Sequence, residues 1–116
     1  MAISDRDLSM RRHLYTRVLG LELSTEWQRQ HFAQWNPLEG PNAGNSALEL
    51  WAKAQEMGLL LEVRWTESTP YAKVWQRRAN DMSSPHLCLK SAAVSDTVPR
   101  VISEAVAKAT GWEEPK

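Results

Sequence analysis

The chain has 116 residues, of which 42% are hydrophobic and 24% are charged. This composition is typical of a folded globular protein, and the length fits one domain. The formal net charge is zero, because 14 basic residues balance 14 acidic ones. A balanced charge argues against extensive wrapping of a nucleic acid, which requires a basic excess.

The sequence carries no pattern for secretion or for a membrane span. Its longest apolar run covers residues 57–61, whereas a transmembrane helix needs ~20 apolar residues. The start, from Met1 to Asp7, contains charged residues and no apolar segment of the kind found in signal peptides. Cys88 is the only cysteine, so an intrachain disulfide is impossible. We therefore expect a cytoplasmic protein without membrane association.

The first predicted element is a helix over residues 5–19. Ser4 can cap its N-terminus, and Gly20 can end it in the left-handed conformation. The stretch that follows, 21–45, has a weaker pattern. Within it, residues 31–35 are predicted to form a short extended segment, followed by a turn and a loop.

A second helix is predicted from Ser46 to Met57. Ser46 and Glu49 have the spacing of a capping box, and Gly58 follows the last helical residue. After it, residues 59–65 alternate with period two, which indicates a half-buried strand.

Two further strands are predicted at residues 71–77 and 86–90. The residues between them, 80–85, are typical of a turn. Two such runs joined by a short polar turn favour an antiparallel meander.

The last predicted helix begins near residues 96–97, where Pro99 fits the first turn, and ends at Gly111. The order of these elements predicts a single α+β domain over 1–112. It would be an α/β sandwich, with about three antiparallel strands covered by three helices. Residues 113–116 are expected to form a flexible tail.

Three segments resemble the small phage and prophage proteins of the ABA-sandwich family. They are the Trp-Asn-Pro-Leu turn at 35–38, the Ala-Leu-Glu-Leu helix that runs into Met-Gly-Leu over 47–59, and the closing helix at 100–111 that ends on glycine. The resemblance covers most of the chain. It implies an α/β sandwich with an accessory role in a phage, and it brings no catalytic residues.

No set of residues has the spacing of a metal site or of a catalytic centre. His13, His31 and His86 share no metal-ligand spacing with Cys88. Cys88 and His86 would share a strand face, but a nucleophilic thiol also needs a lowered pKa and an exposed pocket. A buried structural thiol is the commoner arrangement. We therefore expect no metal, no cofactor, no catalytic residue and no enzymatic activity.

One alternative reading concerns the loop before the second helix. Helix N-termini attract anions, although this loop lacks the Gly-Lys-Ser ending of a nucleotide-binding loop. A phosphate or nucleotide pocket is the alternative hypothesis here, and its candidate ligand-binding residues are Asn36, Asn45 and Ser46.

Basic residues gather in two clusters, and one of these clusters also contains aromatic residues. One lies on the first helix, and the other lies on the second strand, where alternation places four contact-prone side chains on one face. Arginine beside tryptophan suits an acidic protein surface or a nucleic acid. The candidate partner-binding residues are Tyr71, Lys73, Trp75, Arg77, Arg78, Arg11 and Arg12.

The strand cluster allows two accounts. If its face is exposed, it is a binding surface; if a helix covers it, the rings belong to the core. We expect a phage accessory protein that binds a host protein, as an inhibitor of a defence or regulatory system. A small-ligand binder and a nucleic-acid-binding module are the alternatives, and the oligomeric state stays open.

Overall fold

The structure is a computed structural model that describes residues 4–77 and 87–115. Its helices are α1 (Asp5–His13), the π-helical turn η1 (Leu14–Val18), α2 (Glu26–Gln34), α3 (Ala43–Glu56) and α4 (Val98–Ala109). Its strands are β1 (Leu59–Thr66), β2 (Thr69–Arg77) and β3 (Leu87–Val94), which pair antiparallel in the order β1-β2-β3. The predicted α+β fold with a small antiparallel sheet is confirmed.

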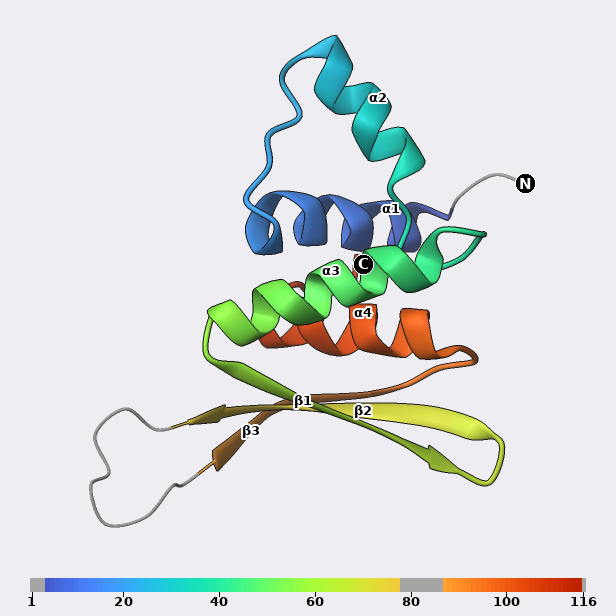
Figure 1. Ribbon diagram of the computed structural model, residues 1–116, viewed down its shortest axis with the longest axis vertical. Helices are drawn as coiled ribbons and strands as arrows, with labels where there is room; N and C mark the ends of the chain where they lie inside the picture. Colours follow the sequence, from blue (N-terminus) through green and yellow to red (C-terminus); the bar gives the residue numbers. More distant parts are fainter. Residues whose placement is uncertain (1–3, 78–86, 116) are drawn as a thin grey trace.

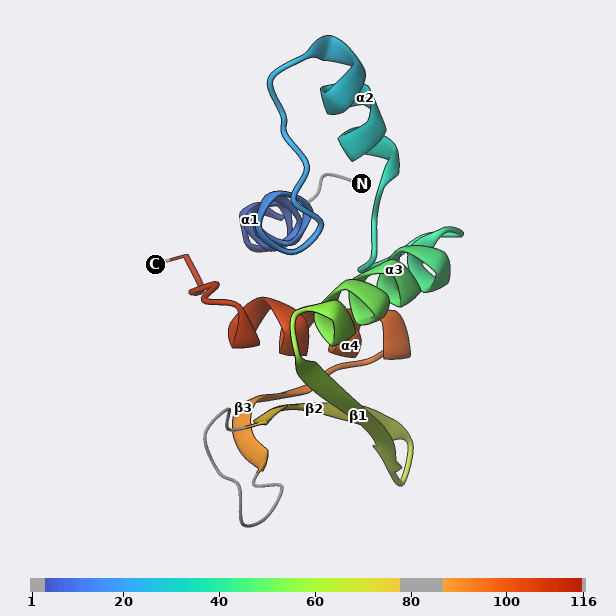
Figure 2. The ribbon, with the colours of Figure 1, turned by 60° about the vertical axis from the view of Figure 1, so that its left-hand side comes forward.

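The described elements are arranged in successive layers (Figures 1 and 2). The sheet lies at one end of the molecule, α3 and α4 pack over one of its faces, and α1 lies above those two helices. α2 projects beyond α1, at the opposite end from the sheet. All four α-helices are therefore on the same side of the sheet.

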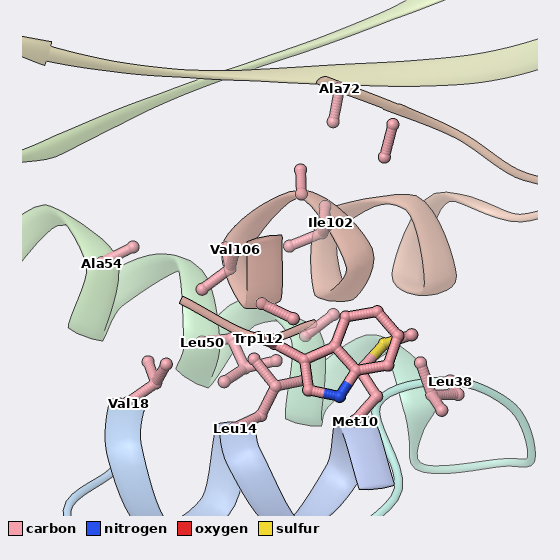
Figure 3. Close-up of a cluster of buried hydrophobic side chains, with 14 of the residues drawn as sticks. Met10, Leu14, Val18, Leu38, Leu50, Ala54, Ala72, Ile102, Val106 and Trp112 are labelled. Atoms are coloured by element: carbon pink, nitrogen blue, oxygen red, sulfur yellow. The ribbon is translucent and has the colours of Figure 1, made fainter. Parts of the chain in front are cut away.

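α4 is the central layer of the core. Its residues 101–107 are all buried, because the sheet covers one side of the helix and α1 and α3 cover the other. Figure 3 shows Ala72 directed from the sheet towards Ile102, while Met10 of α1 and Leu14 of η1 fill the far side with Trp112. Small residues let a helix pack closely on two sides, and α4 provides Ser103, Ala105 and Ala107.

Charged side chains attach α1 to α4 at the edge of this core. The Arg100 guanidinium donates to both carboxylate oxygens of Asp7 at 3.0 Å, and this bidentate contact raises the pKa of Arg100. Arg6 donates to Glu104 at 3.1 Å and to Glu114 at 2.9 Å. The segment after α4, predicted to be a tail, therefore makes an ion pair with α1.

The predicted cap at Ser4 and the predicted glycine ends at Gly20 and Gly111 are confirmed. The Ser4 hydroxyl accepts from the Asp7 N–H, and Thr97 caps α4 in the same way. Gly20 and Gly111 have φ values of 71° and 98°, which glycine adopts at low cost. The first helix changes from α to π geometry at Leu14, so the predicted span holds with a different last turn.

The extended segment predicted at 31–35 is wrong, because these residues end α2 instead. The helix begins with a capping box: the Thr25 hydroxyl accepts from the Gln28 N–H at 3.1 Å, and the Gln28 amide oxygen accepts from the Thr25 N–H at 2.9 Å. Such a reciprocal pair satisfies two donors that a helix start leaves free. The Thr-x-x-Gln spacing of residues 25–28 is typical of a capping box, but no helix was predicted there.

The predicted capping box at Ser46 and Glu49 is also wrong. α3 begins at Ala43, and its N-cap, Asn42, makes no side-chain capping bond. Ser46 lies inside the helix and is buried, so its hydroxyl cannot act as the cap. Three residues assigned to the loop therefore form the first turn of the helix.

The strand predictions are confirmed with shifted ends. β1 ends one residue later than predicted, β2 begins two residues earlier, and β3 continues to Val94. Leu61 and Val63 are half-buried and pack against the core as expected. The predicted turn at 80–85 and His86 lie outside the described residues.

Two valines on the sheet provide a matched test of this architecture. Val74 is completely buried under α4, whereas the Val94 side chain is 67% exposed on the other face. We expect Val74→Asp to destabilise the protein by at least ~3 kcal/mol, since it places an unpaired carboxylate in the core. Val94→Asp should change the free energy of unfolding by less than ~0.5 kcal/mol. Urea denaturation of both variants measures this difference, and equal losses would contradict the arrangement.

Candidate functional site

The face of the sheet that points away from the helices forms a continuous surface. Residues directly opposite each other in antiparallel strands share a face, and Lys73 of β2 pairs with Glu62 of β1 and with Ala92 of β3. We call this surface the outer face. From the described strands it contains Leu60, Glu62, Arg64, Tyr71, Lys73, Trp75, Leu89, Ala92 and Val94.

Two aromatic rings and a lysine occupy the centre of the outer face. The Lys73 ammonium nitrogen lies 5.9 Å from the ring centroid of Tyr71 and 5.9 Å from that of Trp75. These distances are within the range of a cation–π interaction. All three side chains are half-buried, because they lie side by side along the central strand. No helix covers them in the part of the chain that the structure describes (Figure 2).

Aliphatic side chains surround this aromatic centre. Leu60 faces Trp75 from β1 and is 39% exposed, and Leu89 faces it from β3 and is 51% exposed. Val94, opposite Tyr71, is 67% exposed. Such a group of large apolar side chains on one open face is the kind of patch that marks an interaction site.

The charges on the outer face are unevenly paired. The Arg64 Nε atom lies 3.0 Å from the Glu62 carboxylate, so these two charges largely cancel. Lys73 instead has aromatic rings as its neighbours. The outer face therefore offers one central positive charge inside an apolar surface.

The structure brings together three of the predicted partner-binding residues, namely Tyr71, Lys73 and Trp75. It contradicts the account in which a helix covers them as part of the core. Arg77 is the last residue of β2, and Arg78 lies outside the described residues. The sequence did not predict Leu60, Leu89 or Val94 as part of this surface, because alternation assigns a face within one strand but does not say which residues lie opposite it.

The two arginines of the first helix that were predicted to bind a partner differ in exposure. Arg12 is exposed on α1, which lies beyond α3 and α4 from the sheet, so it shares no surface with β2 (Figure 1). Arg11 is only 2% exposed. Its place among the partner-binding residues is therefore wrong.

The Arg11 guanidinium binds the carbonyl groups at the C-terminus of α2. Its Nη2 donates to the Phe32 oxygen at 2.8 Å and to the Trp35 oxygen at 2.7 Å, and its Nε donates to the Trp35 oxygen at 3.2 Å. Its central carbon lies 4.8 Å from the Phe32 ring centroid. Burial lowers the pKa of Arg11, while Asp7 and Glu39 act in the opposite direction. The charge thus satisfies carbonyls that a helix end leaves free.

A cleft of about 280 Å³ lies between the C-terminal end of α2 and the N-terminal end of α3. It is lined by His31, Gln34, Trp35, Asn42, Asn45, Ser46 and Glu49. Two of the three predicted ligand-binding residues, Asn45 and Ser46, therefore line it. Asn36 does not, because its side-chain oxygen accepts from the N–H groups of Leu38 and Glu39 at 3.0 and 3.3 Å.

Trp35 forms part of the cleft wall, and its indole N–H is buried without a hydrogen-bond acceptor among the described residues. The Trp35 side chain is only 5% exposed. Nearby, the His31 Nδ1 atom lies 2.7 Å from the Tyr15 hydroxyl, and the His31 ring stacks on Trp27 with a centroid distance of 5.5 Å. Packed aromatic side chains thus hold His31 and Trp35 on the α2 side of the cleft.

The remaining titratable candidates make local contacts. The His13 Nε2 atom lies 2.8 Å from the Thr110 hydroxyl, and burial lowers the pKa of His13, with a further contribution from Arg17. Cys88 is half-buried on β3, and His86 lies outside the described residues. Over 4–77 and 87–115, no three side chains of His, Cys, Asp or Glu are grouped to hold a metal ion.

Comparison of the chain with protein-family models, with curated proteins and with solved structures found no match. The helices in the described residues are each too short or too polar to cross a membrane.

Neighbouring arginines on α1 allow a matched test of the buried guanidinium. We expect Arg11→Met to destabilise the protein by ~2 kcal/mol or more, because it removes the donors of the Trp35 carbonyl and leaves the Phe32 carbonyl with the Trp35 N–H alone. Amide hydrogen exchange in α2 should accelerate more than exchange in α4. Arg12→Met, at an exposed position, should change stability by less than ~0.5 kcal/mol. Unchanged exchange in α2 of the Arg11 variant would contradict the anchoring role.

Proposed function

We propose that this protein acts by binding another protein through the outer face of its sheet. The observation that carries the proposal is the placement of Tyr71 and Trp75 around Lys73 on a face that no described helix covers. Tryptophan and tyrosine contribute much of the binding energy in protein interfaces when they lose contact with water. Their rings also lose little conformational freedom on binding, since neighbouring strands already hold them.

The charges of the outer face indicate the chemistry of the partner. Glu62 is paired with Arg64, which leaves Lys73 as the charge that a partner can complement. We infer a partner with an apolar surface that places a carboxylate over Lys73. Surrounding Leu60 and Leu89 would exclude water from that contact and strengthen it.

A nucleic acid fits this face less well than a protein. Phosphate binding requires several unpaired cations along the path of the nucleic-acid backbone. The outer face offers Lys73 and Arg64, and Arg64 is already paired with Glu62. Exposed leucine and valine side chains provide no stacking surface for bases, whereas they suit an apolar protein contact. The burial of Arg11 also weakens the alternative of a nucleic-acid surface on α1.

The biological setting that we propose is a bacteriophage or prophage. The partner would then be a protein of the bacterial host cytoplasm, and this protein would inhibit a host defence or regulatory system. The setting is supported by the resemblance of 35–38, 47–59 and 100–111 to the phage ABA-sandwich proteins. The binding mode is supported separately, by the geometry of the outer face.

Two tryptophans provide the test of the binding surface. Trp75 lies on the outer face, and Trp27, which is 71% exposed, lies on α2 at the other end of the molecule. Affinity capture from host lysate should yield a stoichiometric protein that the Trp75→Ala variant loses and the Trp27→Ala variant retains. With the purified partner, Trp75→Ala should weaken binding by ~30-fold, equivalent to ~2 kcal/mol.

A charge reversal tests the predicted carboxylate of the partner. Lys73→Glu should weaken binding at least ~10-fold and reverse its dependence on salt, because the attractive pair becomes repulsive and salt then screens a repulsion. Equal affinity of wild type and the Trp75→Ala variant would contradict the assigned surface. Dimerisation of the protein through the outer face, detected by analytical ultracentrifugation, would show that the occupant is a second copy instead.

A further inference from the structure

The sheet has two edge strands, β1 and β3, and the two edges differ. An edge strand carries backbone N–H and C=O groups that can bond to a further strand, and proteins block such pairing with bulges, lysine and proline. β3 has this kind of block. Val74 pairs with Ser91 and Trp75 pairs with Leu89, so Lys90 has no partner in the register and interrupts the regular strand. β3 is therefore a poor template for another strand.

β1 is a regular edge along its whole length. Its eight residues, Leu59–Thr66, pair with β2 without a register shift and include neither lysine nor proline. α3 contacts β1 on the helix side of the sheet (Figure 2). Among the strands that the structure describes, β2 is the only one that pairs with β1. β1 is therefore open to strand addition, a recurrent mode of protein association.

A large aromatic ring is exposed beside this open edge. Trp65 alternates with Leu61 and Val63, which pack against the core, and it lies opposite the buried Pro70. Trp65 thus belongs to the helix side of the sheet, yet its side chain is 59% exposed. One strand added along β1 would satisfy the backbone of the edge and cover this ring.

The sequence of β1 is complementary to itself. When two copies of β1 pair antiparallel about a two-fold axis through Val63, Glu62 of each copy lies opposite Arg64 of the other. In the same register, Leu61 of each copy lies opposite Trp65 of the other, on the helix side. Cross-strand pairs of opposite charge, and aromatic pairs with aliphatic residues, stabilise a sheet. An axis through Glu62 or Arg64 would place like charges opposite each other, so the charges select the register centred on Val63.

We propose that the protein forms a homodimer by antiparallel pairing of two β1 strands, centred on Val63. The three strands of each copy then join into one continuous sheet. The two-fold axis is perpendicular to this sheet, so the contact is isologous and the helices of both copies lie on the same side. The aromatic centre of the outer face stays uncovered in both copies. The dimer is therefore independent of the binding proposed for the outer face, and it presents that face twice.

Analytical ultracentrifugation of the purified protein measures the association. We expect a monomer–dimer equilibrium with a dissociation constant below ~100 µM. Arg64→Glu should weaken the dimer at least ~10-fold, because two carboxylates then lie opposite each other at both symmetric positions. Adding Glu62→Arg to this variant exchanges the two charges and should restore the dimer. Arg29→Glu carries the same change of charge at an exposed position on α2, so it should dimerise like the wild type.

Amide hydrogen exchange locates the contact. Every second amide of β1 points away from β2, and these amides should exchange more slowly as the protein concentration rises, whereas the amides of β3 should not respond. Circular dichroism checks that each variant is folded. The Trp75→Ala variant should dimerise like the wild type, because Trp75 lies on the outer face and not at the edge.

Three results would overturn the proposal. One is a dimer that Arg64→Glu leaves intact, and another is a dimer that Trp75→Ala abolishes. The third is a wild type that stays monomeric up to ~200 µM. In that last case, protection of the same β1 amides by a captured host protein would assign the edge to that protein instead of a second copy.

Discussion

The buried Arg11 guanidinium determines how the upper half of the molecule is built. α2 has no sheet beneath it, and it is held to α1 and η1 by this guanidinium and by the ring of Tyr15. That ring meets Phe32 and Trp35 edge-on, at centroid distances of 5.1 and 5.6 Å. Burying a lone charge is costly, and the carbonyl oxygens at the end of α2 provide the compensation. The position of the Trp35 indole, and with it the shape of the cleft, follows from this contact.

The lower half depends on the fact that α4 is buried on both sides. Because α1 and α3 cover one side of α4, one face of the sheet is enough to cover the other side of this helix. Ala72 and Val74 fill that contact completely. Alternation then forces Tyr71, Lys73 and Trp75 onto the face without helices. The aromatic surface is thus a direct result of period-two geometry in a sheet that is covered on one side.

The sequence predicted the parts of this fold that depend on local patterns. The alternation over 59–65 and the cap at Ser4 carry strong signals, and both are present in the structure. α2 was missed because its apolar residues show no clear stripe, and Trp27 in its first turn is exposed. Burial of Arg11 could not be predicted, since arginine is rarely buried and its acceptors lie more than twenty positions away. The cleft was only partly predictable, because tertiary packing brings Trp35 and Asn45 to it from the ends of two helices.

Several arginines make contacts within the fold, so they add little to the charge of the surface. Arg6 and Arg100 pair with carboxylates between α1 and α4, Arg64 pairs with Glu62, and Arg11 is buried. Arg12 and Arg17 of the first helix are exposed, so only part of its basic charge lies at the surface. Lys73 differs from these arginines, because two aromatic rings flank it along β2. Glu62, which lies opposite Lys73 on β1, is paired with Arg64. A cation in that environment keeps its attraction for an incoming carboxylate, and the loss of water on binding strengthens that attraction.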